Sequence, residues 1–195
     1  MTKENKINMQ KTLTKGSFLI ANPRLQDPNF NLTVVLICEY NDNGAFGLVV
    51  NRILNVSIAE ALKNNPNATK NKDKVFSGGP VQTNHLLYLH NNNGLSEKAE
   101  RICEGVYLGG DVNYLNNLLS NKTQGDISYR LYLGSAGWAA GQLDEELKIK
   151  SWIVCPGREG FVFHPEPDKL WRQVLRSMGG QYALLSTYPP DPILN

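Results

Sequence analysis

The 195-residue chain lacks several features that would assign it to a common class of proteins. It contains no run of 18 apolar residues, so no membrane-spanning helix is predicted. Its three cysteines, Cys38, Cys103 and Cys155, form no C-x-x-C pair. The sequence therefore predicts neither a disulfide scaffold nor a zinc site, and it favours a reducing, cytoplasmic setting. Charged residues make up 19% of the chain, below the usual share of about 25%, which argues against disorder over most of its length.

The positive charge of the chain is confined to two segments. The formal net charge is +2, but residues 1–15 and 63–74 each contribute +3, so the rest of the chain sums to −4. A nucleic-acid-binding protein usually carries a basic stripe on its folded face. The distribution argues against direct nucleic-acid binding and favours a protein partner or a small ligand. Lys169, Arg172 and Arg176 form one basic helical face, which we interpret as solvated or as a contact for an acidic partner.

The histidines show no spacing typical of a metal site, and no cofactor motif is present. His85 and His90 are five residues apart, so on a strand they point to opposite faces. We predict that they and His164 lie at the surface or at strand ends. A catalytic pair in which His164 activates the Cys155 thiol remains an alternative. A hairpin of Trp152–Cys155 with Phe161–His164 would bring the two side chains together.

The hydrophobic pattern predicts an α+β fold with one core. Residues 1–15 are expected to form a flexible polar tail and residues 16–195 a single domain. Asn41–Gly44 is a turn signal, Ser57–Glu60 a capping box and Asp111 a helix N-cap. The predicted strands are 17–21, 32–40, 45–51, 75–77, 86–90, 127–133, 152–155 and 161–164, and the predicted helices begin at Ser57, Asp111, Gln142 and Pro167.

The segment L-G-S-A-G-W-A-A-G-Q-L, Leu133 to Leu143, is predicted to be a glycine-rich turn from a strand to a helix. Such a turn can bind phosphate at the helix N-terminus. Here the helix begins with Asp144, Glu145 and Glu146, whose charges would repel a phosphate. The alternatives are a purely structural turn and a polar or protein ligand seated against Trp138 and Gln142. Ser77–Pro80, S-G-G-P, is either a second ligand-binding loop or a plain turn.

Four motifs in order carry a resemblance to a known family. They are G-S-F-L-I-A-N-P from Gly16, G-A-F-G-L-V-V-N at Gly44–Asn51, S-G-G-P-V at Ser77–Val81, and G-S-A-G-W-A-A-G-Q-L-D-E-E-L at Gly134–Leu147. The chain resembles the YqgE/AlgH family of bacterial proteins. The resemblance implies a single α+β domain with coiled, bifurcated, mostly antiparallel sheets and several short covering helices. Ser135 stands where an aromatic residue is usual in the family, which implies a smaller or more polar site here.

The resemblance implies no enzymatic activity, although some members of the family are called transcriptional regulators. We therefore expect an uncharacterised, non-enzymatic binding or regulatory protein with no cofactor and no metal. A hydrolase or transferase is the alternative, with its site between the glycine-rich turn, the S-G-G-P loop and Asn51. A DNA-binding regulator that uses Arg172 and Arg176 is the third hypothesis. The candidate ligand-binding or partner-binding residues are Asn51, Gly78, Gly79, Trp138 and Gln142, which would have to converge on one cleft.

Overall fold

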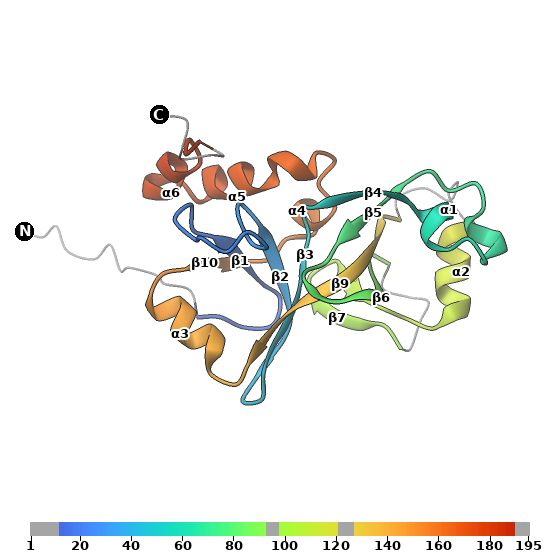
Figure 1. Ribbon diagram of the computed structural model, residues 1–195, viewed down its shortest axis with the longest axis horizontal. Coiled ribbons are helices and arrows are strands. Elements are labelled where there is room, and N and C mark those ends of the chain that lie inside the picture. The colour runs from blue at the N-terminus through green and yellow to red at the C-terminus, as the bar shows by residue number, and fades with distance from the viewer. Residues whose placement is uncertain (1–11, 93–97, 121–126, 190–195) are drawn as a thin grey trace, which may run out of the picture.

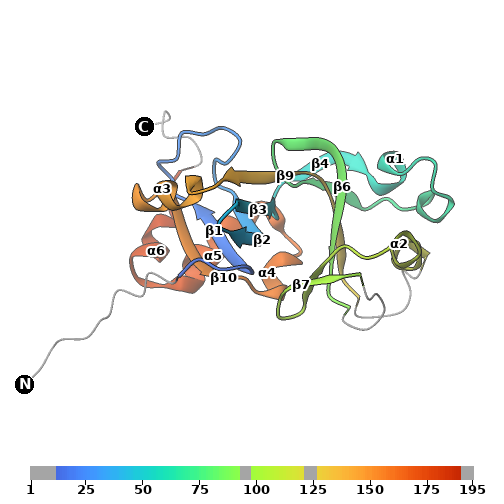
Figure 2. The same cartoon turned by 90° about the horizontal axis from the view of Figure 1, so that it is seen from below.

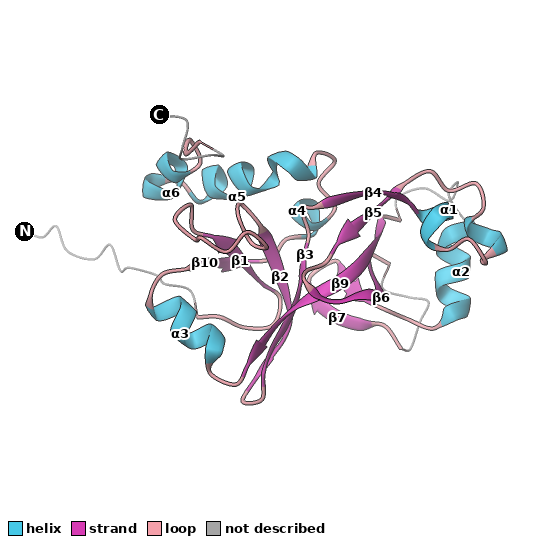
Figure 3. Ribbon diagram, viewed as in Figure 1, coloured by secondary structure: helices cyan, strands magenta, loops and turns pink. Residues whose placement is uncertain are grey.

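Ten β-strands and the helices that cover them make up the computed structural model, which describes residues 12–92, 98–120 and 127–189 (Figures 1 and 3). The strands are β1 (Ser17–Ala21), β2 (Val34–Asn41), β3 (Gly44–Val49), β4 (Ile53–Ser57), β5 (Lys74–Ser77), β6 (Val81–His90), β7 (Glu100–Cys103), β8 (Val106–Leu108), β9 (Tyr129–Ala139) and β10 (Trp152–Pro156). The helices are α1 (Ile58–Ala61), α2 (Val112–Ser120), α3 (Gln142–Lys148), α4 (Glu159–Val162), α5 (Leu170–Met178) and α6 (Gly180–Leu185), with 3-10 turns at Pro66–Ala68 and Pro167–Lys169.

The long strand β9 joins two halves of the sheet, which runs in the order β10-β1-β2-β3-β9-β6-β8-β7. Its second half pairs with β3, whereas its first half pairs with β6 and, in parallel, with β5, which also pairs with β4. In Figure 1 the two halves lie to the left and right of the β9 crossing. Apart from β5–β9, the pairings between the described strands are antiparallel. The predicted α+β class with divided, mostly antiparallel sheets is confirmed.

The sheet half that contains β1, β2 and β3 is buried on both faces, as its unbroken apolar strands predict. Phe18 and Ile20 of β1 belong to a core cluster with Trp171 of α5, whereas Leu19 and Ala21 pack with Leu143 of α3. Because side chains alternate along a strand, α5 and α6 cover one face and α3 the other. In Figure 1, α5 and α6 lie above β1 and β10 and α3 lies below them; Figure 2 gives the same elements seen from below.

Local capping signals fix the helices of the other half. The Ser57 hydroxyl accepts a hydrogen bond from the Glu60 amide, and the Glu60 carboxylate accepts one from the Ser57 amide, so the predicted capping box is present. Asp111 accepts a 2.8 Å bond from the Tyr114 amide and caps α2 as predicted. The two helices cover a third core cluster that includes Ile58 and Leu118.

The glycine-rich segment is not the strand-to-helix turn that the sequence predicts. β9 continues through Gly134, Ser135 and Gly137, and the turn into α3 is confined to Ala140 and Gly141. The glycines serve a crossing of backbones instead. A Cβ atom on Gly78 would lie 2.2 Å from the Gly134 carbonyl oxygen, and one on Gly134 would lie 2.5 Å from that of Gly79. Gly134 also has a φ of +76°, which a residue with a Cβ rarely adopts.

The predicted hairpin between Trp152–Cys155 and Phe161–His164 is also wrong. β10 pairs along its whole length with β1, and the Gly157 amide extends this pairing by donating to the Gly16 carbonyl at 2.8 Å. The chain then enters α4, in which the Val162 amide donates to the Arg158 carbonyl. The apolar run after Gly157 therefore forms a helical turn over the core rather than a second strand.

The predicted N-terminal tail lies partly within the described residues. Residues 1–11 fall outside them. Leu13 is buried in the cluster that contains Leu143, and the Thr14 amide donates to the Ser17 hydroxyl at 3.1 Å. The packed structure therefore begins at least three residues before Gly16.

The glycine crossing generates a stability prediction. Gly78→Ala forces a methyl group against the Gly134 carbonyl and the Leu48 side chain, so we expect a loss of about 1–3 kcal/mol in the free energy of unfolding. Gly160→Ala in α4 is the matched control, because nothing lies within 4 Å of the position that its Cβ atom would take. It should leave stability unchanged or raise it by about 0.5–1 kcal/mol. Urea unfolding of both variants measures the difference in stability. Equal unfolding midpoints would contradict the close backbone contact between Gly78 and Gly134.

Candidate functional site

Three of the five predicted site residues, Asn51, Gly78 and Gly79, are in contact with the protein's own backbone. The Asn51 side chain accepts a 2.8 Å hydrogen bond from the Val34 amide and donates one of 3.0 Å to the Leu32 carbonyl. It thereby holds the start of β2 against the end of β3. Gly78 and Gly79 lie at the crossing with β9, where their backbones are in contact with Gly134 and Ser135. Ser135 itself is 7% exposed, so the backbones at this junction are packed together.

The other two predicted residues, Trp138 and Gln142, meet at one carboxylate. Glu146 of α3 accepts hydrogen bonds from the indole nitrogens of Trp138 at 2.9 Å and Trp152 at 2.6 Å, both through Oε2. Its Oε1 accepts a 2.9 Å bond from the Gln142 amide, whose oxygen in turn accepts from the Ala139 amide. Phe30 packs against both indole rings, with centroids 6.1 and 5.4 Å away. This Glu146 cluster, Glu146 with Trp138, Gln142 and Trp152, locks α3 onto the sheet.

The carboxylates at the start of α3 do more than complement the helix dipole. Glu146 is committed to the two indoles, and Asp144 accepts a 2.6 Å bond from the Tyr40 hydroxyl. The residue at the N-cap position of α3 is Gly141, which has no side chain with which to cap the helix. These contacts join α3 to β2, β9 and β10, and they give no support to a phosphate at this helix terminus. The structure thus brings Trp138 and Gln142 together but does not bring Asn51, Gly78 and Gly79 to them.

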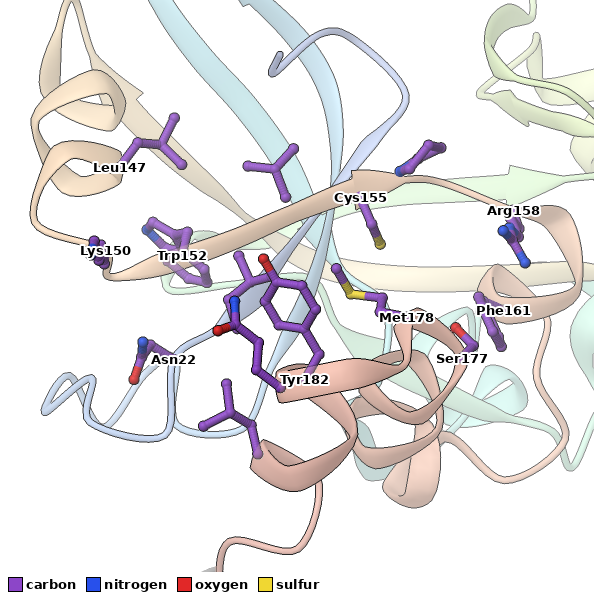
Figure 4. Close-up of a pocket in the computed structure, with 15 residues that line it drawn as sticks. Asn22, Leu147, Lys150, Trp152, Cys155, Arg158, Phe161, Ser177, Met178 and Tyr182 are labelled. Atoms are coloured by element: carbon purple, nitrogen blue, oxygen red, sulfur yellow. The ribbon is translucent and has the colours of Figure 1, made fainter. Parts of the chain in front are cut away.

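A groove of about 580 Å³ lies elsewhere, along β10. All five residues of β10 line it, together with the end of α3, the start of α4, and the facing sides of α5 and α6. Figure 4 shows Tyr182 rising from α6 toward β10, and Met178 facing the Cys155 thiol. None of the five predicted residues lines this groove. Its elements are distant in sequence, so no local motif marks it.

The groove has a mixed polar and apolar lining, with a cation at each end of β10. Met178, Tyr182 and Phe161 are half-buried in its walls. Lys150 and Arg158 stand at opposite ends of β10, both exposed (Figure 4). No Asp or Glu lines the groove, and neither cation forms an ion pair within residues 12–92, 98–120 and 127–189. The groove therefore offers two cations, and no carboxylate of its own, to whatever lies in it.

Comparison with known proteins identifies the family. A family model described as AlgH-like matches residues 18–183. The chain belongs to the AlgH-like family. It is 38% identical over 183 residues to a UPF0301 protein of Chlamydia pneumoniae, with 94% of this chain and 96% of the relative covered. It is 39% identical over 184 residues to a UPF0301 protein of Cytophaga hutchinsonii, with 94% and 100% covered.

Two solved structures share the fold. The solution structure of the AlgH protein from Pseudomonas aeruginosa matches with a TM-score of 0.71 and 27% identity, over 97% of this chain and 98% of that one. The crystal structure of protein DIP2367 from Corynebacterium diphtheriae matches with a TM-score of 0.77 and 21% identity, over 91% and 94%. The resemblance to the YqgE/AlgH family is thereby confirmed, and the family is one of uncharacterised proteins.

The thiols of this AlgH-like chain are not arranged for nucleophilic catalysis. Cys38 is buried in β2, as predicted, and burial raises its pKa. Burial also raises the pKa of the half-buried Cys103. His164 does not line the groove beside Cys155; its Nδ1 instead accepts a 3.0 Å bond from the Glu166 amide. The Cys155–His164 nucleophile therefore has no structural support.

Metal-binding and membrane-spanning features are absent from the described parts of the chain. No three His, Cys, Asp or Glu side chains there are grouped as metal ligands would be. No helix of these residues has the length and apolar character needed to cross a bilayer.

The predicted basic face of α5 is solvated at Lys169 and Arg176, which are exposed, and its two arginines also form a clasp on α6. Arg172 donates to the Ser186 carbonyl, and the Arg176 Nε donates to the Ser186 hydroxyl at 3.3 Å. Lys169 pairs with Glu166. Ser186 follows the last residue of α6, so the two arginines bind the C-terminal end of that helix, where cations are favoured. They position α6 as one wall of the groove.

His90 lies at a strand end, one of the two positions predicted for the histidines, but it is fully buried there at the end of β6. Its Nε2 lies 2.9 Å from the Gly109 carbonyl and its Nδ1 3.2 Å from the Tyr114 hydroxyl. Since a carbonyl can only accept, the neutral ring donates from Nε2 and accepts at Nδ1. The Tyr107 ring stacks on it with centroids 5.7 Å apart. His85, on the same strand, is exposed.

His90 makes the stability pH-dependent. Burial lowers its pKa below the ordinary value of 6.5, so the folded state binds fewer protons than the unfolded state as the pH falls through that value. The neutral His90 ring therefore contributes to the free energy of unfolding above pH 6.5, and this contribution is lost as the pH falls below that value. Between about pH 7.5 and about pH 5.5 the melting temperature should fall, and it should fall less in His90→Gln. Thermal unfolding at both pH values tests this, with His85→Gln as the control that keeps the wild-type dependence. An unchanged dependence in His90→Gln would contradict the assignment.

The Glu146 cluster generates a second stability prediction. Glu146→Ala leaves two indole N–H groups, on residues only 6% and 5% exposed, without their acceptor. We expect a loss of about 1–3 kcal/mol in the free energy of unfolding. Glu145→Ala on the same helix removes only an exposed pair with Lys148 and should change stability by less than about 0.5 kcal/mol. Denaturant titration followed by tryptophan fluorescence measures both, and equal losses would refute the anchoring role of Glu146.

Proposed function

We propose that this AlgH-like protein is a non-enzymatic binding or regulatory protein that holds its partner in the groove between β10 and helices α5 and α6. The observation that supports this proposal most is the groove itself, about 580 Å³ in volume, with apolar and polar side chains in its walls and a cation at each end of β10. Ligand sites are typically concave, mostly apolar and equipped with a few placed polar groups. The groove is concave and places polar and cationic groups around apolar side chains such as Met178 and Tyr182, whereas the backbones of the two glycine segments near Asn51 are in direct contact.

The alternative, a hydrolase or transferase, has less support. Its predicted site lay between the glycine-rich segment, the S-G-G-P loop and Asn51, where a Cβ atom on Gly79 would already lie 2.3 Å from Ser135. A substrate needs space beside a nucleophile and its base. Cys155 is among the residues that line the groove, and no histidine, aspartate or glutamate is.

Regulation through a protein partner fits the charges better than direct contact with DNA. Arg172 and Arg176, the cations that a DNA-binding surface would need, are engaged at Ser186. Lys150 and Arg158 are two isolated charges rather than a stripe. The three cysteines are free of disulfides, which supports a reducing, cytoplasmic setting. A role in transcription would then be exerted through another protein.

A fragment screen tests the proposed site. A mixture of small apolar acids is added to the isotopically labelled protein, and amide signals are followed by NMR. We expect hits to shift the signals of β10 and α6. Gln181→Trp fills the groove from an exposed position of its lining and should abolish these shifts. Leu184→Trp, on the same helix, outside the groove lining and 74% exposed, should leave them intact.

Two outcomes would contradict the proposed function. Hits that cluster outside the groove and are insensitive to Gln181→Trp would move the site elsewhere. A fragment that is chemically turned over, with the turnover lost on replacing a single residue, would make the protein an enzyme.

A further inference from the structure

The outer edge of β10 offers unused backbone hydrogen bonds to the groove. In an antiparallel pair, alternate residues exchange hydrogen bonds with the partner strand and those between them point outward. Bonds from the Asn22 amide to the Ser151 carbonyl and from the Gly157 amide to the Gly16 carbonyl fix this alternation at both ends of the β1–β10 pair. The bonded positions of β10 are therefore 151, 153, 155 and 157. Trp152, Val154 and Pro156 direct their backbone groups away from β1.

These outward groups are unsatisfied within the described chain. β10 pairs only with β1, and no hydrogen bond of the described residues reaches the backbone of Trp152 or Val154. Two amide donors and two carbonyl acceptors thus face outward, about 6.6 Å apart along the strand. They adjoin the groove, because Trp152 and Val154 both line it. An open strand edge of this kind is a template for an added strand.

We infer that the groove binds an extended, acid-flanked peptide segment of another protein, which adds to the sheet as a strand beside β10. The inference rests on the proposed function and names its class of partner. Backbone pairing with Trp152 and Val154 supplies the register, as in other strand-addition complexes. One set of alternate side chains packs toward Tyr182 and Met178, and the other toward Leu147. Acidic residues at the two ends of the segment pair with Lys150 and Arg158.

The charges exclude a second copy of this chain as the preferred occupant. Two β10 strands related by a twofold axis at Val154 would place Lys150 of one copy opposite Arg158 of the other. Like charges directly opposite each other destabilise a strand pair. Pro156 shortens the edge further, because it has no N–H to donate. The same features that disfavour self-pairing leave two donors and two cations for an acidic segment.

Hydrogen exchange at single amides tests the added strand. The probe is the nine-residue peptide E-T-V-T-V-T-V-T-E, titrated to millimolar concentration and followed by NMR. Exchange at the Trp152 and Val154 amides should slow by on the order of tenfold at saturation, because these amides gain acceptors. Ile153 and Cys155, already paired with β1, should change much less. A peptide methylated at alternate backbone nitrogens should lose the protection.

Variants separate backbone pairing from charge. Val154→Pro removes one outward N–H without touching the bonds to β1, and it should weaken peptide binding by about tenfold. Val154→Thr is its control, since it keeps the N–H and should keep the affinity. Lys150→Glu combined with Arg158→Glu should reduce affinity for the acid-flanked peptide by about fivefold and favour the lysine-flanked form. This charge swap concerns exposed residues only, so it stands even where the proline variant fails to fold.

Three results would overturn the proposal of an added strand with acidic ends. Peptide-induced shifts in the groove without protection at Trp152 and Val154 would show binding in another geometry, and the proposed function would survive. Equal affinity for acid-flanked and lysine-flanked peptides would remove the role of the cations. A stable dimer in sedimentation, dissociated by Val154→Pro, would make a second copy the occupant. By contrast, the proposed function itself fails only when fragments bind outside the groove or are turned over.

Discussion

The structure depends on the close contact between the backbones of two segments, Gly78–Gly79 and Gly134–Ser135. At this crossing β9 leaves β5 and β6 and joins β3, so one strand belongs to both halves of the sheet. Side chains would hold the backbones apart, because even a methyl group on Gly78 would lie 2.2 Å from the Gly134 oxygen. The absence of a Cβ atom therefore decides the topology. The hydrogen bonds on either side, from the Val49 amide to Gly78 and from the Gly78 amide to Leu133, then close the junction.

The second organising contact is the Glu146 cluster. A carboxylate that is partly removed from water is stable only where donors replace the water, and here two indoles and an amide do so. The cluster ties α3 to β9 and β10 at once. It also leaves the end of α3, with Leu147 and Lys150, at the rim of the groove. The architecture that buries Trp138 and Trp152 thus sets one boundary of the proposed binding site.

Local patterns predicted the fold where a segment's structure is decided by its own residues. The β2–β3 hairpin, the capping box at Ser57 and the stripe of α5 all follow from neighbours in sequence. The prediction of a turn in the glycine-rich segment was wrong because glycines permit either a turn or a close crossing of two backbones. Only the distant Gly78–Gly79 selects between the two. Trp138 and Gln142 were recognised, but their partner Glu146 was interpreted as a dipole complement. The groove was missed because the edge position of β10 follows from the order of strands, which no short motif encodes.

The helix α6 has no buried residue of its own, although it forms a wall of the groove. It is held chiefly from outside, by the clasp of Arg172 and Arg176 at Ser186, and by partial packing of Tyr182 and Leu185. Substitutions on such a helix carry little cost to the core. Packing therefore constrains the sequence of this wall less than that of the sheet beneath it. Relatives that share the fold closely can therefore differ in what they hold, and likeness of fold within the family is a poor guide to likeness of partner.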